Sequence, residues 1–355
     1  MRRLGLAFVL CAALCGLAAR AFAGPVGERH LTASDASAAL RDSWHLPSFR
    51  VVVWYPAAAG SVERRIDEKP YFVVGAAAQG AAFADSRPRP VILLSHGNGG
   101  TARIMGWFGT AMARAGYVVI AVDHPGNNAL DKMTAPGSLL PWERVHDLAS
   151  ALATAEADPI VGPHIDDGRV GVAGFSAGGF TALVAAGARV DIARFVRFCH
   201  ANPTDGNCKP QKELPLTLAD MDATMAAPEF AGALDHSGDD LRIPQVRAAF
   251  AIAPAIVQGL TPEGLRRMRV PVAIILGDAD PIATPATNGL VAAQLIPRAA
   301  LKVLPGVGHY DWLATCTPAG AAALDICADK SPQDPTHAAA IAMALALFAR
   351  TLGTP

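Results

Sequence analysis

The sequence predicts an α/β fold: a mostly parallel, doubly wound sheet with one inserted lid. Apolar runs typical of buried strands alternate with helical patterns from near residue 49 almost to the end of the 355-residue chain. This alternation implies right-handed crossovers and helices on both faces of one sheet. Residues 190–244 interrupt it, because they carry prolines and polar residues without a clear period. An insertion of that length between two core strands is usually either a functional lid or disordered, and the pair Cys199 and Cys208 favours an ordered lid.

The predicted elements follow one another in a regular order. Apolar runs at 50–56 and 71–74 are interpreted as edge strands on either side of a charged turn. The remaining apolar runs are interpreted as strands of the buried sheet: 90–97, 116–126, 168–174, 247–254, 270–278 and 300–306. Helices are expected at 101–115, 139–157, 178–188, 262–268, 286–295 and 336–352.

The N-terminal segment is typical of a secretory signal peptide. Arg2 and Arg3 precede an uncharged apolar run at 4–19, and small residues around Ala23 form a cleavage site. We therefore expect export, with cleavage after Ala23, to the periplasm or the medium. A retained anchor is disfavoured because the run is shorter than the roughly 20 residues that a spanning helix needs. Lipidation at Cys15 is disfavoured because a large leucine precedes it.

Length and charge describe the remaining chain. Residues 24–355 suffice for one large domain with a single core, and no later segment is expected to span a membrane. Lys and Arg number 30 against 31 Asp and Glu, so the chain shows no electrostatic footprint for nucleic acid or anionic lipid. We expect a small-molecule or lipid-like partner rather than a nucleic acid.

The cysteines that follow the leader predict disulfides. Four remain, and an even number in an exported chain favours disulfides with three possible connectivities. Close neighbours in sequence are the simplest pairs, Cys199 with Cys208 and Cys316 with Cys327. The alternative, a zinc site, is disfavoured because the spacings contain no CxxC and no histidine cluster accompanies them. No metal is expected.

A GxSxG pattern surrounds Ser176, with Gly174 and Gly178 two residues to either side. This pattern marks a nucleophile elbow, in which the chain turns sharply from a strand into a helix. In a chain with 33 glycines it can also arise by chance, so its context decides. A predicted strand precedes the serine and a predicted helix follows it. The context therefore favours Ser176 as a nucleophile.

A serine nucleophile needs a histidine base and a carboxylate that orients the base. In a doubly wound sheet these groups belong at the carboxyl ends of later strands. Asp278 and Asp280 follow one such predicted strand, and His309 follows the next. The two aspartates would point to opposite sides if the strand continued, so only one can reach His309.

The order serine, aspartate, histidine on this kind of sheet is that of the α/β-hydrolases. Within that fold the chain resembles the exported bacterial proteins called predicted dienelactone hydrolases, related to platelet-activating-factor acetylhydrolase-type lipases. The resemblance covers about residues 50–350 and rests on SHGNGGT (95–101), DHPGNN (123–128), GFSAGG (174–179), DADPIATP (278–285) and GHYDWLATC…ICAD (308–329). True dienelactone hydrolases use a cysteine nucleophile where this chain has Ser176, so the family's name is weak support for a lactone substrate.

The resemblance also suggests roles for individual residues. Similarity to the family's acid motif selects Asp280 over Asp278, which is expected in a turn or a helix cap. The loop after His96-Gly97 resembles the one that supplies an oxyanion donor, here the backbone N–H of Asn98. The elbow geometry assigns the second donor to the backbone N–H of Ala177. His96 itself is expected to hold the loop.

Other motifs have simpler interpretations. The glycines after His96 lack the Lys-Ser/Thr of a phosphate loop, and Ala102 stands where a dinucleotide fingerprint needs glycine. Asp123 and His124 could be metal ligands, but neighbouring residues point to different sides and no third ligand is suitably spaced. Three tryptophans are expected in the core rather than in an acyl pocket: Trp107, Trp142 and Trp312.

These observations together predict a serine hydrolase that cleaves carboxylic esters without a cofactor. Ser176 would attack the acyl carbon, His309 would move the proton, and Asp280 would orient the imidazole. The alternative within the enzyme class is an amidase or peptidase, because a fold does not fix the substrate. The alternative outside it is a hydrolase-fold binding protein that has lost activity.

Overall fold

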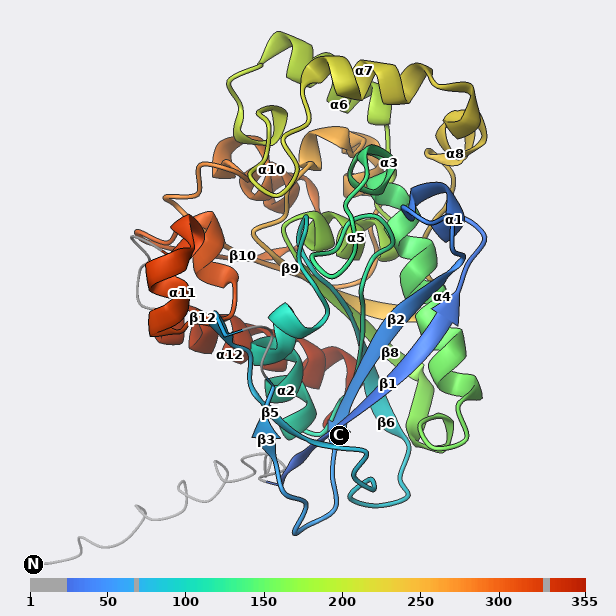
Figure 1. Cartoon of the computed structure of the whole chain (residues 1–355), viewed down its shortest axis with the longest axis vertical. Coiled ribbons are helices and arrows are strands. Elements are labelled where there is room, and N and C mark those ends of the chain that lie inside the picture. Colours follow the sequence, from blue (N-terminus) through green and yellow to red (C-terminus); the bar gives the residue numbers. More distant parts are fainter. Residues whose placement is uncertain (1–23, 67–69, 328–332) are drawn as a thin grey trace, which may run out of the picture.

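The computed structural model describes residues 24–66, 70–327 and 333–355, so the predicted leader, 1–23, lies outside the described residues. Ten strands form one sheet: β1 (Val26–Ser34), β2 (Ser48–Pro56), β3 (Arg64–Arg65), β5 (Ala76–Gln79), β6 (Arg89–Ser95), β7 (Val118–Val122), β8 (Ile165–Phe175), β9 (Val246–Ile252), β10 (Val272–Gly277) and β11 (Ala300–Leu304). Their order is β11-β10-β9-β8-β6-β7-β2-β1-β5-β3 (Figure 1).

The six strands from β6 to β11 are parallel, as the alternation of apolar runs and helices predicted. β2 runs antiparallel to both of its neighbours, β7 and β1. The predicted α/β fold with a mostly parallel sheet is therefore confirmed. The carboxyl ends of all six parallel strands meet at one edge of the sheet, where side chains from distant parts of the sequence come together.

The prediction of two edge strands at the N-terminal side is wrong. β2 lies inside the sheet because β1, which was not predicted, pairs along its whole length. The pattern of β1 is hidden by polar residues, including Glu28, which is buried and accepts a hydrogen bond of 2.9 Å from Trp54 Nε1. The second expected edge strand becomes β4 (Phe72–Val73), which pairs with β12 (Thr315–Cys316) in a separate two-stranded sheet.

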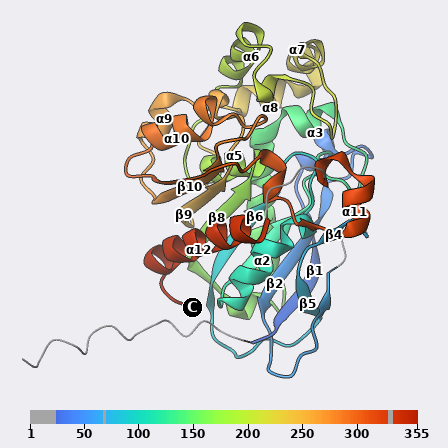
Figure 2. The ribbon, with the colours of Figure 1, turned by 90° about the vertical axis from the view of Figure 1, so that its left-hand side faces the viewer.

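Helices cover both faces of the sheet. α2 (Gly106–Arg114) and α12 (Gln333–Leu352) pack on one face, which Figure 2 turns toward the viewer. The other face carries α4 (Arg144–Ala157), α5 (Ala177–Ala185), α9 (Pro262–Arg266) and α10 (Gly289–Leu295). Strand residues alternate between two apolar cores, as the period of two requires: Val51 and Val53 join one core, and Val52 and Trp54 join the other.

Helix α12 is the one described helix that is long and apolar enough to cross a membrane. One side of it is nevertheless buried in the protein, where residues such as Ala344 and Phe348 pack against the sheet and α2. A buried core helix meets the same criterion of length and composition. Its packing explains its apolar character.

The insertion (residues 190–244) folds into α6 (Ile192–Ala201), α7 (Leu218–Ala226) and α8 (Ala231–His236), joined by 3₁₀ turns. Asp191 caps α6, and Thr217 forms a capping box with Asp220 at the start of α7. Figure 1 shows the insertion at the top, beyond the helices and strands of the main domain. Short helices α1 (Ala38–Arg41), α3 (Ala135–Leu139) and α11 (Pro318–Ala323) complete the described chain.

Candidate active site

Ser176 occupies a sharp turn between β8 and α5. Its backbone has φ 56° and ψ −119°, a conformation that non-glycine residues rarely adopt and that costs about 1–3 kcal/mol. A Cβ at Gly174 would lie 2.1 Å from the carbonyl oxygen of Gly178, and one at Gly178 would lie 2.0 Å from that of Ser95. Both glycines of the GxSxG pattern are therefore required by close backbone contacts at this turn.

His309 and Asp280 reach Ser176 from the ends of neighbouring strands. Asp280 follows β10, and His309 follows β11 at the start of a 3₁₀ turn. His309 Nε2 lies 2.8 Å from Ser176 Oγ, and its Nδ1 lies 2.7 Å from Asp280 Oδ2. All three residues are at most 5% exposed. We call Ser176, His309 and Asp280 the elbow set.

The acid of the elbow set is itself held in place. Asp280 Oδ1 accepts hydrogen bonds from the backbone N–H groups of Ile282 (2.9 Å) and Ala283 (2.8 Å), so the other oxygen faces His309. Because a carboxylate accepts, Nδ1 of His309 donates to it and Nε2 can accept the proton of the serine hydroxyl. Asp278 is exposed and accepts a bond of 2.7 Å from the N–H of Gly306, within a turn. The structure brings Asp280, and not Asp278, to His309.

The loop after β6 lies against the elbow. A Cβ at Gly97 would come within 3.3 Å of Ser176 Cβ, so the loop and the serine are in close contact. In the part of the chain that the structure describes, the backbone N–H groups of Asn98 and Ala177 donate no turn or cap hydrogen bond. The two predicted oxyanion donors therefore have no competing acceptor of that kind.

Asn127 fixes this loop and was not singled out from the sequence. Its side-chain Nδ2 donates to Asn98 Oδ1 (2.7 Å) and to Ser138 Oγ (2.8 Å), and its Oδ1 accepts from the N–H of Gly99 (3.3 Å). The amide thus uses both donors and its acceptor, which determines its orientation. Its place after β7, among the strand ends, and within the DHPGNN motif (123–128) could have indicated it.

His96 supports the loop, as expected from the sequence. Its Nδ1 lies 2.6 Å from the carbonyl oxygen of Gly97, and its Nε2 accepts from the backbone N–H of His124 (3.2 Å). Complete burial lowers the pKa of His96 well below its ordinary value, so the ring stays neutral near pH 7. A neutral ring can donate from one nitrogen and accept at the other, as these two bonds require.

A second hydrogen-bonded set lies behind this loop, and we call it the buried set: Ser95, His124 and Asp147. Ser95 Oγ lies 2.8 Å from His124 Nε2, and His124 Nδ1 lies 2.8 Å from Asp147 Oδ2. None of the three is measurably exposed. Arg41 donates to both carboxylate oxygens of Asp147, at 2.9 and 2.7 Å. Burial lowers the pKa of His124 to about 3.

Arg144 connects the buried set to the loop of Asn98. Its Nη2 donates to the carbonyl oxygen of His96 and lies 3.4 Å from Ser95 Oγ. Burial lowers the pKa of Arg144 to about 9. The guanidinium thus stays charged at neutral pH and binds the start of the loop from behind.

The residues considered as metal ligands have other partners. Asp123 accepts from the N–H of Ala102 (2.7 Å) and from Arg50 Nε (3.1 Å). His124, its neighbour, belongs to the buried set. Over residues 24–66, 70–327 and 333–355, no group of three or more His, Cys, Asp or Glu side chains could hold a metal ion.

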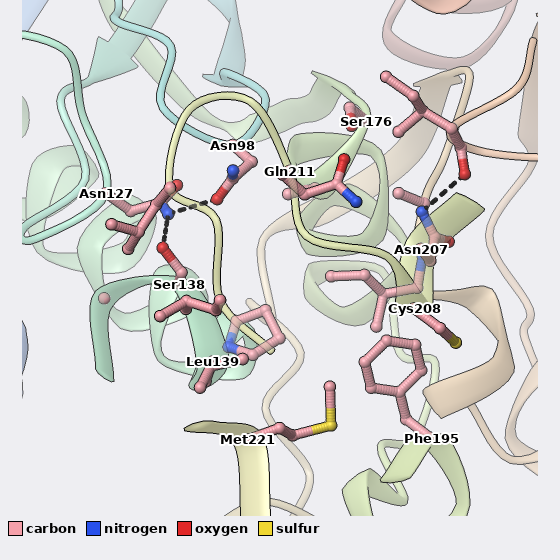
Figure 3. Close-up of a pocket in the computed structure, with 18 of the residues that line it drawn as sticks. Asn98, Asn127, Ser138, Leu139, Ser176, Phe195, Asn207, Cys208, Gln211 and Met221 are labelled. Atoms are coloured by element: carbon pink, nitrogen blue, oxygen red, sulfur yellow. Dashed lines mark hydrogen bonds between the residues drawn. The ribbon is translucent and has the colours of Figure 1, made fainter. Parts of the chain in front are cut away.

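A cavity of about 100 Å³ opens beside Ser176. The main domain lines one part of it, including Asn98, Asn127 and Leu139, and the insertion lines another. Figure 3 shows Ser176 at one end of this lining and Phe195 and Met221 at the other. The three tryptophans considered for a pocket do not line it and are buried in the core instead: Trp107, Trp142 and Trp312.

Two disulfides lie near the cavity and near the C-terminal segment. Cys199 in α6 is bonded to Cys208, which lines the cavity, and Cys316 is bonded to Cys327. A further contact joins the insertion to the residue after His309: Tyr310 Oη donates to Glu213 Oε1 at 3.0 Å. Desolvation and the neighbouring carboxylate raise the pKa of Tyr310.

Comparisons with known proteins agree with this fold. Among solved structures, a ferulic acid esterase from Streptomyces cinnamoneus resembles the chain with a TM-score of 0.55 and 18% sequence identity, over 94% of this chain and 91% of that chain. At that identity the likeness shows a shared fold alone. No curated protein matches the chain. A family model described as "Alpha/beta hydrolase family" matches residues 91–323, well over half of the sequence. The chain therefore belongs to the alpha/beta hydrolase family.

Proposed function

We propose that this protein is a serine hydrolase that cleaves carboxylic esters through an acyl-enzyme intermediate. The observation that carries the proposal is the hydrogen-bonded elbow set, in which Asp280, His309 and Ser176 lie in line beside a cavity. A serine hydroxyl becomes a nucleophile when a histidine can take its proton and a carboxylate orients that histidine.

In the first half of the proposed reaction, Ser176 Oγ attacks the acyl carbon while His309 Nε2 takes the hydroxyl proton. The negative charge that develops on the carbonyl oxygen is stabilised by the N–H groups of Asn98 and Ala177. Ala177 begins α5, so the positive end of the helix dipole favours the same oxygen. Asp280 stabilises the imidazolium that forms.

In the second half, His309 gives its proton to the leaving alcohol, and the acyl group remains on Ser176. Water then attacks the acyl carbon, with His309 as the base, and the acid product leaves. Asn127 and Arg144 hold the loop of Asn98 in the geometry that both halves need. Each of these steps is carried out by side chains or backbone groups of the chain itself.

Three further features belong to the proposal. An ester, rather than an amide, is supported by the name of the structural neighbour, which is an esterase. The insertion acts as a lid, which its contribution to the cavity beside Ser176 supports. Export after removal of residues 1–23 is supported by the two disulfides, which persist in oxidising compartments.

Labelling with a fluorophosphonate probe tests the nucleophile. We expect the folded protein to be labelled, and we expect Ser176→Ala and urea-unfolded protein not to be. Equal labelling of wild type and Ser176→Ala would contradict the assignment of the nucleophile. A folded wild type that is not labelled would favour the binding-protein alternative.

Paired substrates test the bond type. We expect 4-nitrophenyl butyrate to be cleaved with a much higher kcat/KM than the anilide of the same acid, 4-nitrobutyranilide. Because the acyl group is the same in both, the ratio depends on the leaving group and on the bond alone. Equal or faster cleavage of the anilide would overturn the ester assignment in favour of an amidase.

A further inference from the structure

The cavity beside Ser176 is small. Its volume of about 100 Å³ lies well below the roughly 300–1,000 Å³ of sites for drug-sized ligands. A cavity of about 150 Å³ holds benzene, which has six heavy atoms, so 100 Å³ corresponds to about four. A chain that extends from an acyl carbon bound to Ser176 therefore has space for about four carbons.

The far wall of the cavity comes from the insertion. Phe195 of α6 and Met221 of α7 both line it and are only 6% and 7% exposed. Both belong to one apolar cluster with the disulfide-bonded Cys199 and Cys208. The disulfide ties α6, which carries Phe195, to the segment of Cys208, and Met221 of α7 is held by packing in the same cluster, so the wall resists a longer acyl chain.

We infer that the insertion restricts this protein to esters of short acyl chains, up to about four carbons, and that Phe195 and Met221 set the limit. The inference rests on the proposed esterase function. It assigns these two residues to specificity and not to the chemical step, because they lie at the end of the cavity lining away from Ser176 (Figure 3).

Truncation of either residue should lengthen the accepted chain. Met221→Ala removes three heavy atoms from the wall and Phe195→Ala removes six. Because a packed core collapses only partly around a deleted side chain, most of that space should remain open to substrate. We therefore expect the limit to move from about four carbons to about seven in Met221→Ala and further in Phe195→Ala.

Each variant has a matched control on the same helix. Met225 lies one turn after Met221 in α7, and Phe198 lies one turn after Phe195 in α6. Both pack against the same apolar cluster, but neither lines the cavity. Met225→Ala and Phe198→Ala should therefore destabilise the insertion comparably without a change in chain-length preference.

The experiment measures kcat/KM for 4-nitrophenyl esters of 2, 4, 6, 8 and 12 carbons. We expect the wild-type value to fall at least tenfold from 4 to 8 carbons. The ratio of the 6-carbon to the 4-carbon value should rise in Met221→Ala, and the ratio of the 8-carbon to the 4-carbon value should rise about tenfold in Phe195→Ala. Both ratios should stay at their wild-type values in the two controls. These ratios do not depend on the fraction of folded protein, because all substrates meet the same sample.

The results that would overturn this inference differ from those that would overturn the proposed esterase function. A wild type that prefers 8 carbons to 4, or a ratio that changes equally in the cavity variants and their controls, would overturn this inference alone. If the folded wild type hydrolysed none of the esters, the proposed function would fail and this inference with it.

Discussion

The elbow set and the buried set share the same chemistry and nearly the same distances. In both, a serine hydroxyl lies 2.8 Å from Nε2 of a histidine, whose Nδ1 lies 2.7 or 2.8 Å from an aspartate. In both, the serine stands at or just after the end of a parallel strand, β6 or β8. The two sets differ in what surrounds them.

The surroundings of the buried set prevent proton transfer. Arg41 already binds both oxygens of Asp147, and Arg144 lies beside Ser95, so an imidazolium at His124 would face two cations. Burial also lowers the pKa of His124 to about 3. In the elbow set the partners of Asp280 among the described residues are His309 and two backbone N–H groups, and a cavity adjoins Ser176. Access and the nearby cations, more than hydrogen-bond geometry, distinguish the two sets, and they agree with the proposal that the elbow set carries out the reaction.

Replacing the serine of each set should give the largest difference between the two sets. Ser176→Ala should lower kcat by a factor on the order of 10⁶, because the covalent route is lost. Ser95→Ala removes one hydrogen bond in the core and should change kcat less than tenfold. Hydrolysis of 4-nitrophenyl butyrate measures both. A comparable loss in the two variants would show that the buried set takes part in the reaction.

A second pair of variants tests which of two nearby aspartates, Asp280 or Asp278, orients His309. Asp280→Asn should lower kcat by a factor on the order of 10⁴, since an amide cannot stabilise the imidazolium and favours the wrong tautomer. Asp278→Asn, which affects a turn with Gly306, should leave kcat within a few fold of the wild-type value. Hydrolysis of 4-nitrophenyl butyrate measures kcat for both variants. An Asp278→Asn variant as impaired as Asp280→Asn would contradict the assigned acid.

In the buried set the aspartate should matter for stability. Asp147→Asn leaves the buried guanidinium of Arg41 without its carboxylate, which should lower the free energy of unfolding by about 3–5 kcal/mol. Asp166→Asn, which breaks a half-exposed pair with Arg169, is the control and should cost at most about 1 kcal/mol. Urea unfolding measures both. Equal losses in the two variants would mean that Asp147 has no special structural role.

The elbow set could be predicted because a local signal marks each of its members, although Ser176 and His309 are 133 residues apart. Ser176, Asp280 and His309 each follow an apolar strand within a few residues, and the order of the strand ends places them at one edge of the sheet. The alternation of strands and helices predicted the parallel sheet for the same reason. The buried set could not be predicted, because Asp147 lies inside α4 and not at a strand end, so no motif connects it to Ser95 and His124.

The insertion shows the other limit of sequence analysis. Its helices are short, and the helical period of α6 spans only two turns, with apolar residues at Ile192, Phe195, Val196 and Cys199. That period was overlooked among the prolines and polar residues that follow it. Strand β1 was missed because Glu28 is a charged residue in a buried position, satisfied by Trp54 and Arg103. The local pattern therefore contains α6, whereas the tertiary partners of Glu28 determine β1.

The smallest expected effect is a loss of folding stability in mildly acidic solution. The pKa of His124 is about 3 in the folded protein, because of burial, and 6.5 in the unfolded chain. Between these values the unfolded chain binds more protons, so the free energy of unfolding should fall as pH decreases below 6.5, by up to about 1.4 kcal/mol per pH unit. His96, whose pKa burial also lowers, adds to the loss.

Urea unfolding between pH 7.5 and 5 measures this slope. Glu28 does not affect the slope there: its pKa is lowered to about 2, so the stability that it contributes is lost only below its unfolded value of 4.5. His124→Gln should reduce the slope, since one titrating group is lost, even though the variant is less stable overall. His200→Gln, which removes a half-exposed histidine paired with Asp222, should keep it. A wild-type stability that stays constant over this range would mean that the buried histidines are not held neutral, and the contrast between the two sets would then rest on access alone.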